Sequence, residues 1–577
     1  MPTTEDLRSR ALRVALENAL RHGSDPRPES VLGALLGGDP ELRSRKELVR
    51  SVVEEAVREV VALSPGAREE RLRALGGATT PAGRTGPREE RSREPLELPP
   101  LPGAVPGKVV LRFAPFPSGA LHVGHARALW INDAYRERYQ GRFLLVFDDT
   151  VGSAEKRPDK ESYDLIQEDF RLAGIRVDAL HYKSDRIPEH YRHLPPLLEK
   201  RAAYVCLCPP ELLRKNRLAG VACPERDRDP GWQEDAWQGM LSGRYGVGEA
   251  VVRLRTDMQH PNPAFRDRVL FRISDLDHPR VGRRYRVWPL LEYSWAVDDV
   301  DLGITHVIRG KDLVMEDEME RALWKVMGAR GPELLHFGLL RLRVGELSKS
   351  KFQREIASGV FEGWSDPRTW SLRSLWQRGI QPESLKEFVL SFGLSLADIE
   401  VPAETLYAYN RQRLDPVTPR RSFVPAPVQL RVTGVPPWPG PVELANHPEH
   451  PEMGRRALHV GSEFYLPRAD LEAHAGEEIR LKDLMNVRLP HPLAPGVVEA
   501  SFVDLPNRPL PRIQWVPSEG ACPVSVVQID GSRVEGLAEP SVSSAREGEI
   551  YQFERVGFVR AGSPSAGAPR RFHLAHG

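Results

Sequence analysis

Two histidines three residues apart, His122 and His125, stand where the chain should pass from a buried strand into a helix. The β-rich apolar run before them ends at Phe113 and is typical of a central strand, while residues 123–134 carry apolar side chains near helical spacing. The turn between the two segments contains residues that interrupt regular structure: Pro115, Pro117 and Gly119. Histidines at i and i+3 on a first helical turn share a face, and beside the helix dipole their N–H groups suit a phosphoryl group that gains negative charge.

The surroundings of the pair favour catalysis over the ordinary alternatives, which are a polar cap on an exposed helix or a metal site. Ser118 and Gly119 complete a tight turn before the pair, and Gly124 lies between the two histidines. A second strand candidate, residues 143–147, follows the helix and ends in two aspartates. Such a unit directs the helix N-terminus into the crevice beyond the strand ends, where nucleotide phosphates bind.

The stretch from Arg112 to Arg127, RFAPFPSGALHVGHAR, resembles the HIGH motif region of class I aminoacyl-tRNA synthetases, and more narrowly the glutamyl/glutaminyl branch. The second signature of that class is expected far downstream. Residues 346–351, ELSKSK, resemble it as KMSKS with Glu and Leu in place of the first two letters. Because both motifs occur in the family's order and spacing, the chain is identified as a member, and the resemblance covers nearly everything from residue 108 onward.

The resemblance implies a glutamate–tRNA ligase of the archaeal/eukaryotic type that uses ATP with Mg²⁺. Glutamate would form glutamyl-adenylate, and the aminoacyl group would pass to the 2′-hydroxyl of the terminal adenosine of tRNA(Glu), with tRNA(Gln) as a further candidate. Catalysis is assigned to His122, His125 and Lys349, although a lysine in a Ser-Lys-Ser run is more often solvated. The expected ATP contacts are Pro115, Ser118, Gly119, His122, Gly124, His125, Lys311, Ser348, Lys349 and Ser350.

Recognition of L-glutamate calls for fixed guanidinium groups, because arginine holds a carboxylate with two parallel hydrogen bonds. The residues that the resemblance implies for this role are Arg112, Ala114, Asp148 and Arg309. Arg112 could instead pair with a neighbouring acid, and Asp148 could cap its turn. Phe116 and Leu291 depart from the polar residue and the tyrosine of many relatives, so a glutaminyl-tRNA synthetase stays as the alternative.

Two other classes of protein share parts of this pattern. A catalytically silent tRNA-binding paralogue should carry damaged signatures, whereas both histidines and Lys349 are present. A small nucleotidyltransferase of the HIGH superfamily would be short and would lack a β-rich tail.

The chain is too long for one hydrophobic core, and its changing residue pattern predicts a multidomain protein with α/β and all-β parts. The residue pattern alone indicates amphipathic helices at the N-terminus and a Pro/Gly-rich linker after them. After residue 420 it indicates short β-strands roughly every 8–12 residues. The resemblance adds the roles of the parts. The expected parts are a helical N-terminal extension (1–75), a linker (76–107), the first half of a Rossmann-like catalytic domain (108–200), an acceptor-end-binding insertion (201–285), the second half with the Ser-Lys-Ser loop (286–352), a helical connector (353–419) and anticodon-binding β-barrels (420–577). In the second catalytic half, a strand around Ile304–Ile308 is expected to deliver Thr305, Arg309 and Lys311 to its carboxyl end.

Contacts with tRNA are expected in the connector and the barrels, where unstacked bases bind aromatic and arginine side chains. The candidates are Trp364, Arg368, Arg411, Arg421 and Arg480.

Three clustered cysteines suggest a metal in the insertion. Cys206-Leu-Cys208 followed by Cys223 resembles the start of a zinc site, and Glu225 stands where relatives often offer histidine. A carboxylate can bind Zn²⁺, but a remnant knuckle of three reduced cysteines is an equal alternative.

The composition of the chain limits the kinds of partner and cellular location that we expect. The net charge is only +1, with 81 basic and 80 acidic residues, so nucleic acid must be attracted by local basic patches. Four cysteines argue for a reducing compartment, and no apolar run approaches the ~20 residues of a membrane span. No export signal is visible at the N-terminus. We therefore expect a cytoplasmic monomer that makes no contact with membranes.

Overall fold

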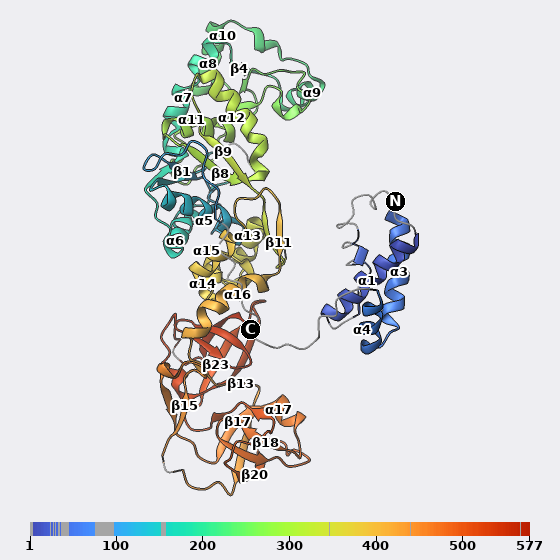
Figure 1. Ribbon diagram of the computed structural model, residues 1–577. Coiled ribbons are helices and arrows are strands. Elements are labelled where there is room, and N and C mark those ends of the chain that lie inside the picture. Colours follow the sequence, from blue (N-terminus) through green and yellow to red (C-terminus); the bar gives the residue numbers. More distant parts are fainter. Residues whose placement is uncertain are drawn as a thin grey trace. The chain divides into compact units, whose positions relative to one another are not determined.

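The computed structural model describes residues 4–22, 25–26, 28, 31–32, 35, 46–75, 97–151, 157–345, 347–438, 440–565 and 567–577. The chain divides into two compact units, Met1–Arg93 and Glu94–Gly577 (Figure 1). Among the described residues, no helix has both the length and the apolar character needed to cross a membrane.

The first unit is helical, as predicted. Its described helices are α1 (Thr4–His22), α3 (Lys46–Val61) and α4 (Pro65–Ala74). Helices α1 and α3 pack through small and branched apolar side chains such as Ala11, Ala15 and Val53. Leu48 is exposed, and the buried face of α3 begins one residue later at Val49. Most of the predicted linker, residues 76–96, lies outside the described residues.

The second unit begins with a five-stranded parallel sheet in the order β3-β2-β1-β8-β9. Its strands are β1 (Val110–Phe113), β2 (Arg142–Phe147), β3 (Ala179–Tyr182), β8 (His306–Gly310) and β9 (Glu333–Phe337), and its helices are α5 (Val123–Arg138), α6 (Lys160–Leu172), α11 (Leu291–Asp301) and α12 (Val314–Met327). Strand β2 is buried from Phe143 to Phe147 without alternation, as expected where helices cover both faces. Chain order reverses between β1 and β8, the position at which open α/β sheets bind ligands.

One strand-edge prediction is wrong. Thr305 precedes β8, and its hydroxyl accepts a hydrogen bond at 2.9 Å from the N–H of Val110 at the start of β1. Thr305 therefore lies at the amino end of the sheet, away from Arg309 and Lys311 at the carboxyl end. The apolar run begins at Ile304, before the strand does, so Thr305, one position before β8, was placed at the wrong edge.

Between the two halves of this sheet lies an antiparallel sheet in the order β4-β5-β6-β7. Its elements are β4 (Ala203–Cys206), β5 (Val251–Leu254), β6 (Val269–Ile273), β7 (Val287–Pro289), α7 (Ile187–Arg192), α8 (Pro195–Glu199), α9 (Pro210–Ala219) and α10 (Pro230–Ser242). Trp237, Phe271 and Tyr293 are buried in its core.

The connector follows β9. It comprises β10 (Leu340–Leu342), α13 (Lys349–Ala357), α14 (Leu372–Arg378), α15 (Pro382–Leu390), β11 (Ile399–Val401) and α16 (Ala403–Leu414). Its apolar side chains, such as Leu375, Leu385 and Leu406, join the core around α5 and β1. The connector therefore shares one core with the parallel-sheet domain.

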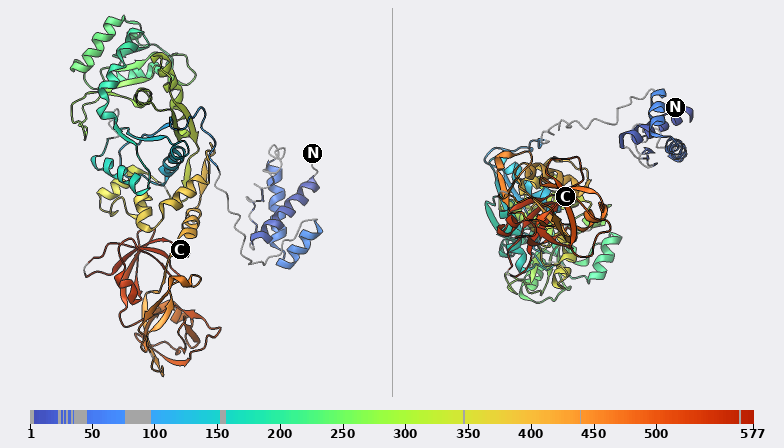
Figure 2. Two further views of the ribbon diagram at one scale, coloured as in Figure 1. Left: turned by 60° about the vertical axis from the view of Figure 1, so that its left-hand side comes forward. Right: turned by 90° about the horizontal axis from the view of Figure 1, so that it is seen from below.

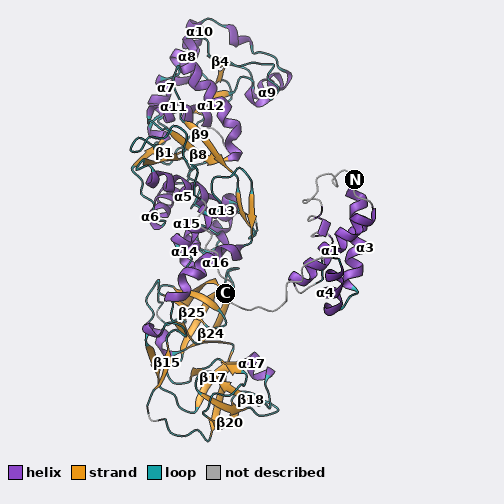
Figure 3. Ribbon diagram, in the orientation of Figure 1, coloured by secondary structure: helices purple, strands orange, loops and turns teal. Residues whose placement is uncertain are grey.

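From residue 420 the chain forms two seven-stranded sheets, ordered β12-β25-β26-β27-β23-β24-β13 and β21-β18-β19-β20-β14-β17-β22, together with the hairpin β15-β16. Their barrel-like, almost helix-free character confirms the predicted all-β tail (Figure 3). The elements are β12 (Arg420–Arg421), β13 (Phe423–Pro425), β14 (Pro427–Thr433), β15 (Val442–Ala445), β16 (Arg455–Leu458), β17 (Glu463–Pro467), α17 (Arg468–Ala473), β18 (Glu478–Leu481), β19 (Met485–Arg488), β20 (Val498–Asp504), β21 (Arg512–Ile513), β22 (Val516–Pro517), β23 (Cys522–Val527), β24 (Arg533–Ala538), β25 (Ile550–Phe553), β26 (Gly557–Ala561) and β27 (Arg570–His576). The sheet containing β27 packs on α14, and the other sheet lies beyond it (Figure 2).

Candidate active site

A ring nitrogen of each histidine accepts a hydrogen bond from a backbone N–H at the start of α5. His122 is the N-cap, and its Nδ1 accepts a hydrogen bond at 3.1 Å from the N–H of Gly124. His125 Nδ1 in turn accepts at 3.2 Å from the N–H of His122. A Cβ atom on residue 124 would lie 2.8 Å from His122 Cε1, so the capped ring requires glycine there. The ring centroids are 4.1 Å apart.

These bonds fix the chemistry of both rings. Because Nδ1 accepts, the proton of each neutral imidazole resides on Nε2, which remains a donor. Desolvation by the surrounding protein, followed by the charge of Lys349, lowers the pKa of His122 to about 3. Desolvation and the neighbouring His122 hold the pKa of His125 well below its usual range. The pair therefore offers neutral N–H donors at the N-terminus of α5.

Lys349 reaches the same turn from the second motif. It is the first residue of α13, which Ser348 caps through its side chain, and Ser350 beside it is exposed. The ammonium of Lys349 donates to the carbonyl of Gly119 at 3.4 Å. Desolvation lowers the pKa of Lys349 to about 8, against the opposing effect of Asp169. The structure thus brings together the three predicted catalytic side chains.

The connector covers the turn from the other side. A Cβ on Gly119, whose φ is +115°, would lie 2.2 Å from the indole of Trp364, so this indole rests directly on the turn. The N–H of Val123 donates to the carbonyl of Trp370 at 3.1 Å, and that of Leu372 donates to the carbonyl of Leu121 at 2.8 Å. Trp364 was predicted to contact tRNA, and nothing in the sequence signalled its contact with the turn at Gly119, for which ATP contacts were predicted.

Two buried side chains of α6, one acidic and one hydroxyl, anchor the same turn. Asp169 accepts a hydrogen bond from the N–H of Leu121 at 2.8 Å, and Ser162 Oγ accepts one from the N–H of Gly119 at 2.5 Å. Burial raises the pKa of Asp169 to about 7. Ser118 donates its N–H to the carbonyl of Phe116 at 3.0 Å, which closes the turn internally.

The predicted glutamate-binding arginines lie at the carboxyl edge of the sheet, each paired with acids. Arg112 donates two hydrogen bonds to Asp299, at 2.5 and 2.8 Å. Arg309 donates two to Glu320, at 2.9 and 3.0 Å, and one to Asp317 at 2.7 Å. Burial opposes the charge of Arg112, but Asp299 more than offsets it and raises its pKa. Burial raises the pKa of Glu320 to about 7.

Other predicted ligand residues have partners as well. Asp148 Oδ1 lies 3.0 Å from the ammonium of Lys183, and Ala114 is half-buried beside this edge. Lys311 forms an ion pair with Asp398 at 3.0 Å. Lys183, which sequence reasoning missed, is fully buried immediately after β3. Its position after a strand that borders β2 was the available signal.

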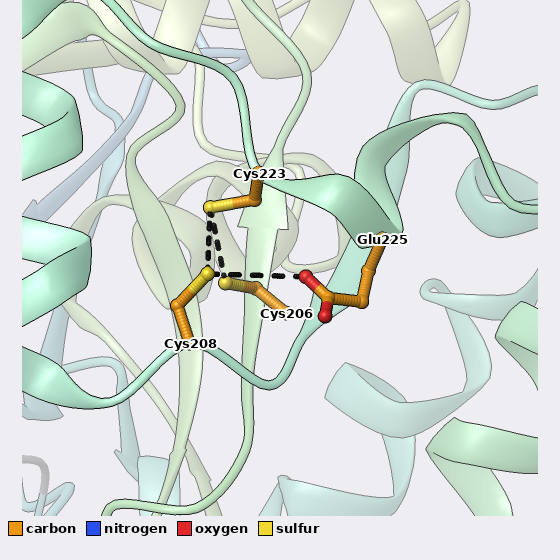
Figure 4. Close-up of side chains that lie close together, drawn as sticks. All are labelled: Cys206, Cys208, Cys223 and Glu225. Atoms are coloured by element: carbon orange, nitrogen blue, oxygen red, sulfur yellow. Dashed lines mark hydrogen bonds between the residues drawn. The ribbon is translucent and has the colours of Figure 1, made fainter.

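The four predicted metal ligands converge in the insertion (Figure 4). Cys223 Sγ lies 3.4 Å from Cys206 Sγ and 3.3 Å from Cys208 Sγ, and Glu225 Oε2 lies 3.9 Å from Cys208 Sγ. All four ligand atoms lie within 4.8 Å of one another. Hydrogen bonds from Cys206 and Cys208, with the charge of Arg253, lower the pKa of Cys223 to about 6 despite its burial. One thiolate is therefore stabilised before any metal binds.

The predicted tRNA-contacting arginines all have intramolecular partners. Arg368 donates to Asp366 at 2.7 and 2.8 Å, and Arg411 donates to the carbonyl of Gly577. Arg421 donates to Asn446 at 2.9 Å, and Arg480 donates to Asn486 at 3.0 Å.

A cavity of about 380 Å³ lies between the two C-terminal sheets. Its lining includes Arg420, Arg455, Arg456, Lys482, Gln514 and Trp515. Sequence reasoning missed these residues, although the pair Arg455-Arg456 on a short strand was a visible signal.

The comparisons with known proteins agree with this geometry. A family model described as tRNA synthetases class I (E and Q), catalytic domain, matches residues 108–416, and two models of the anticodon-binding domain match residues 418–496 and 512–562. A glutamate–tRNA ligase of Pyrococcus furiosus is 40% identical over 562 residues, covering 95% of this chain and 96% of that protein. Glutamate–tRNA ligases of Methanopyrus kandleri (39%, 98% of each) and Methanothermobacter thermautotrophicus (39%, 100% of each) are also similar.

Proposed function

The chain belongs to the class I tRNA synthetases of the E and Q family, and on that premise we propose that it is a glutamate–tRNA ligase. The observation that carries the proposal is the meeting of both signatures, with the Lys349 ammonium 3.4 Å from the carbonyl of Gly119 on the turn that leads into the histidine pair. ATP and glutamate would form glutamyl-adenylate here, and tRNA(Glu) would accept the aminoacyl group on its terminal 2′-hydroxyl.

In the first step, the protein mainly positions ATP and stabilises charge. The Nε2–H groups of His122 and His125 donate to oxygens of the α-phosphate, where negative charge grows as the glutamate carboxylate attacks. Lys349 attracts the β- and γ-phosphates, and its ammonium stabilises the departing pyrophosphate. Mg²⁺ bound to the ATP phosphates supplies further charge neutralisation.

The carboxyl edge of the sheet would hold the amino acid. Arg112 and Arg309 are fixed in orientation by their acid partners, so each presents its remaining N–H groups to a carboxylate without reorganisation. Asp148 would accept from the α-ammonium group. This places the α-carboxylate toward the turn that binds the α-phosphate.

The cavity between the C-terminal sheets would receive an unstacked base of the anticodon. Its lining combines four cationic side chains with the acids Glu443, Asp483 and Glu554, and Lys482 is paired with Glu554 at 2.6 Å. The cavity would therefore hold a base through the donors of its arginines and the ring of Trp515 rather than through a purely positive surface. Arg455→Ala and Lys482→Ala should raise KM for tRNA while leaving KM for ATP unchanged. An unchanged KM for tRNA in both variants would contradict this role.

The cysteine cluster would hold a structural zinc ion. Three thiolates and one carboxylate suit tetrahedral Zn²⁺, and Arg253 Nη1, 2.8 Å from Cys223 Sγ, offsets part of their excess negative charge. Purified protein should contain one equivalent of zinc by mass spectrometry, and Cys223→Ser should lose it. Failure of the wild-type protein to bind added zinc would favour the remnant knuckle.

The decisive experiment is aminoacylation of homologous tRNA with labelled glutamate and, separately, labelled glutamine. Charging with glutamate supports the proposal, and sorting the product by isoacceptor shows whether tRNA(Gln) is charged too. Charging with glutamine alone would assign the sister specificity. We also propose that the enzyme is a cytoplasmic monomer. Light scattering of the purified protein measures its molar mass and so tests the monomeric state.

A further inference from the structure

One indole at the carboxyl edge of the parallel sheet gathers three cations. Trp295, on α11, is 5% exposed. The guanidinium carbons of Arg112 and Arg309 lie 5.2 and 5.0 Å from the centroid of its ring, and the ammonium of Lys183 lies 5.3 Å from it. Cations are attracted to an indole face, but three buried charges around one ring also repel one another. Each cation is also paired with an acid (Asp299, Glu320 and Asp148), so a ligand would be recognised through the donors that these pairs leave free.

The cluster contains buried donors without acceptors. Neither Trp295 Nε1 nor Arg309 Nε has a hydrogen-bond partner among the described residues, and both atoms are buried. A buried donor without an acceptor costs free energy, so two in one cluster favour a ligand that completes them. Both are donors, so the ligand group they fit is an acceptor.

Lys183 contributes a third donor. Its side chain is fully buried, and its ammonium lies 3.0 Å from Asp148 Oδ1 and donates to Ser294 Oγ at 2.7 Å. The hydroxyl of Ser294 itself donates to the carbonyl of Leu291 at 3.0 Å. An ammonium carries three N–H groups, so one remains beyond these contacts with described residues.

The Lys183–Asp148 pair also explains how the site stays neutral without substrate. Asp148 is the acid assigned to the α-ammonium group of the amino acid. When that ammonium pairs with Asp148, it replaces Lys183 as counterion, and Lys183 becomes available to a carboxylate. The Lys183–Asp148 ion pair is thus replaced by two new pairs: Asp148 with the α-ammonium of the ligand, and Lys183 with a carboxylate of the ligand.

Resting on the proposed function, we propose that Lys183 and Trp295, with Arg309, bind the side-chain carboxylate of glutamate and so exclude glutamine. A carboxylate has only acceptor sites, so its two oxygens suit these unpaired donors. The amide of glutamine would turn its NH₂ group toward N–H donors and leave buried groups unpaired, which is the strongest form of discrimination available to a binding site.

The test compares both amino acids in the same variants. Lys183→Met keeps most of the length of the side chain and removes the ammonium, and Trp295→Phe keeps an aromatic ring and removes the N–H together with part of the indole. The measurement is kcat/KM for tRNA charging with glutamate and with glutamine at fixed ATP and tRNA. We expect Lys183→Met to lower the glutamate value about 100-fold and Trp295→Phe about 10-fold, with the glutamine value changed much less.

The ratio of the two values separates this role from a structural one. If Lys183 acts only by holding Asp148, the loss is common to both amino acids, because glutamate and glutamine carry the same α-ammonium group. Equal loss for both therefore overturns the proposal. Lys183→Gln, whose carbonyl can accept from an amide, should raise the glutamine value relative to Lys183→Met.

Lys386→Met is the matched control, since Lys386 is an ion-paired lysine outside the cluster, 3.3 Å from Glu137. Its ratio should equal that of the wild type. If Lys183→Met fails to fold by circular dichroism, Trp295→Phe decides alone: an unchanged ratio overturns the proposal. Wild-type protein that charges glutamine only would overturn the proposed function instead, so the two failures are distinct.

Discussion

The protonation of three side chains at the first turn of α5 determines how the site meets ATP. His122 and His125 hold their Nδ1 atoms against backbone N–H groups and are neutral. In the proposed reaction they would therefore bind phosphate oxygens without attracting the nucleotide over a distance. Lys349 supplies the mobile positive charge, but desolvation lowers its pKa to about 8. The charge at this turn therefore depends on Lys349 and on Asp169, whose pKa is raised to about 7 by burial.

Activity should therefore decline on the alkaline side. Lys349 is charged below its pKa and loses the charge as pH rises, so kcat/KM for ATP should fall through about pH 8 in the wild type. Lys349→Arg should abolish this decline, because guanidinium stays charged, even if its rate is lower. Adenylate formation with homologous tRNA, measured from pH 6.5 to 9.5, provides the profile. An identical alkaline limb in Lys349→Arg would assign it to another group.

The segment between α13 and α14 packs against the turn before α5, residues 117–121, for which we propose contacts with ATP. It lays the indole of Trp364 on Gly119, and its backbone pairs with Leu121 and Val123. The same segment follows the helix that begins with Lys349, and Phe352 of that helix contacts the Trp364 ring edge-on at 6.5 Å. The two signature motifs are thus joined through one short stretch.

Removal of the indole should loosen the ATP turn. Trp364→Ala should raise KM for ATP about tenfold, because small displacements of a positioned substrate cost large factors in rate. Trp364→Phe, which keeps a ring, should retain most activity. KM for glutamate, whose cluster lies at the strand edge, serves as the internal control. If Trp364 instead contacts only tRNA, KM for tRNA rises and KM for ATP does not.

Arg378 ties the catalytic body to the C-terminal sheet that contains β27. It is 1% exposed and donates to the carbonyls of Leu574 and Ala575 at 3.1 and 2.7 Å, and to Tyr407 at 2.9 Å. Burial lowers its pKa. No acid is among these partners, so the hydrogen bonds to strand carbonyls are what hold it in place.

Arg378→Met should lower the free energy of unfolding by about 3 kcal/mol, because two buried carbonyls lose their donors. Thermal melting followed by circular dichroism measures the loss. Arg411→Met is the control: this exposed arginine donates to the carbonyl of Gly577 nearby, and its replacement should shift the melting point little. Equal shifts in both variants would contradict the assigned role of burial.

The two compact units differ in what they carry. All candidate site residues lie in Glu94–Gly577, and the described side chains of the first unit form their own core. Deletion of residues 1–93 should therefore leave glutamate charging unchanged when folding is verified by melting. A large loss of kcat with intact folding would show that the first unit contributes to the reaction.

Much of this protein was readable from local pattern. The strand before His122, the helix after it and the β-rich tail follow from periodicity and from Pro/Gly breaks, which depend only on neighbours in sequence. The Cys-x-Cys, Cys-x-Glu set was equally visible, because its ligands come from two short segments. Motif order identified the reaction class before any fold was known.

Tertiary structure alone decided which charges meet. Lys183, Trp295 and Arg309 are far apart in the chain, and only the parallel sheet brings β3, α11 and β8 to one edge. The same holds for Trp364 on Gly119. Periodicity tells which face of an element is buried but carries no information on which distant residue lies opposite, because that contact depends on the packing of the whole sheet.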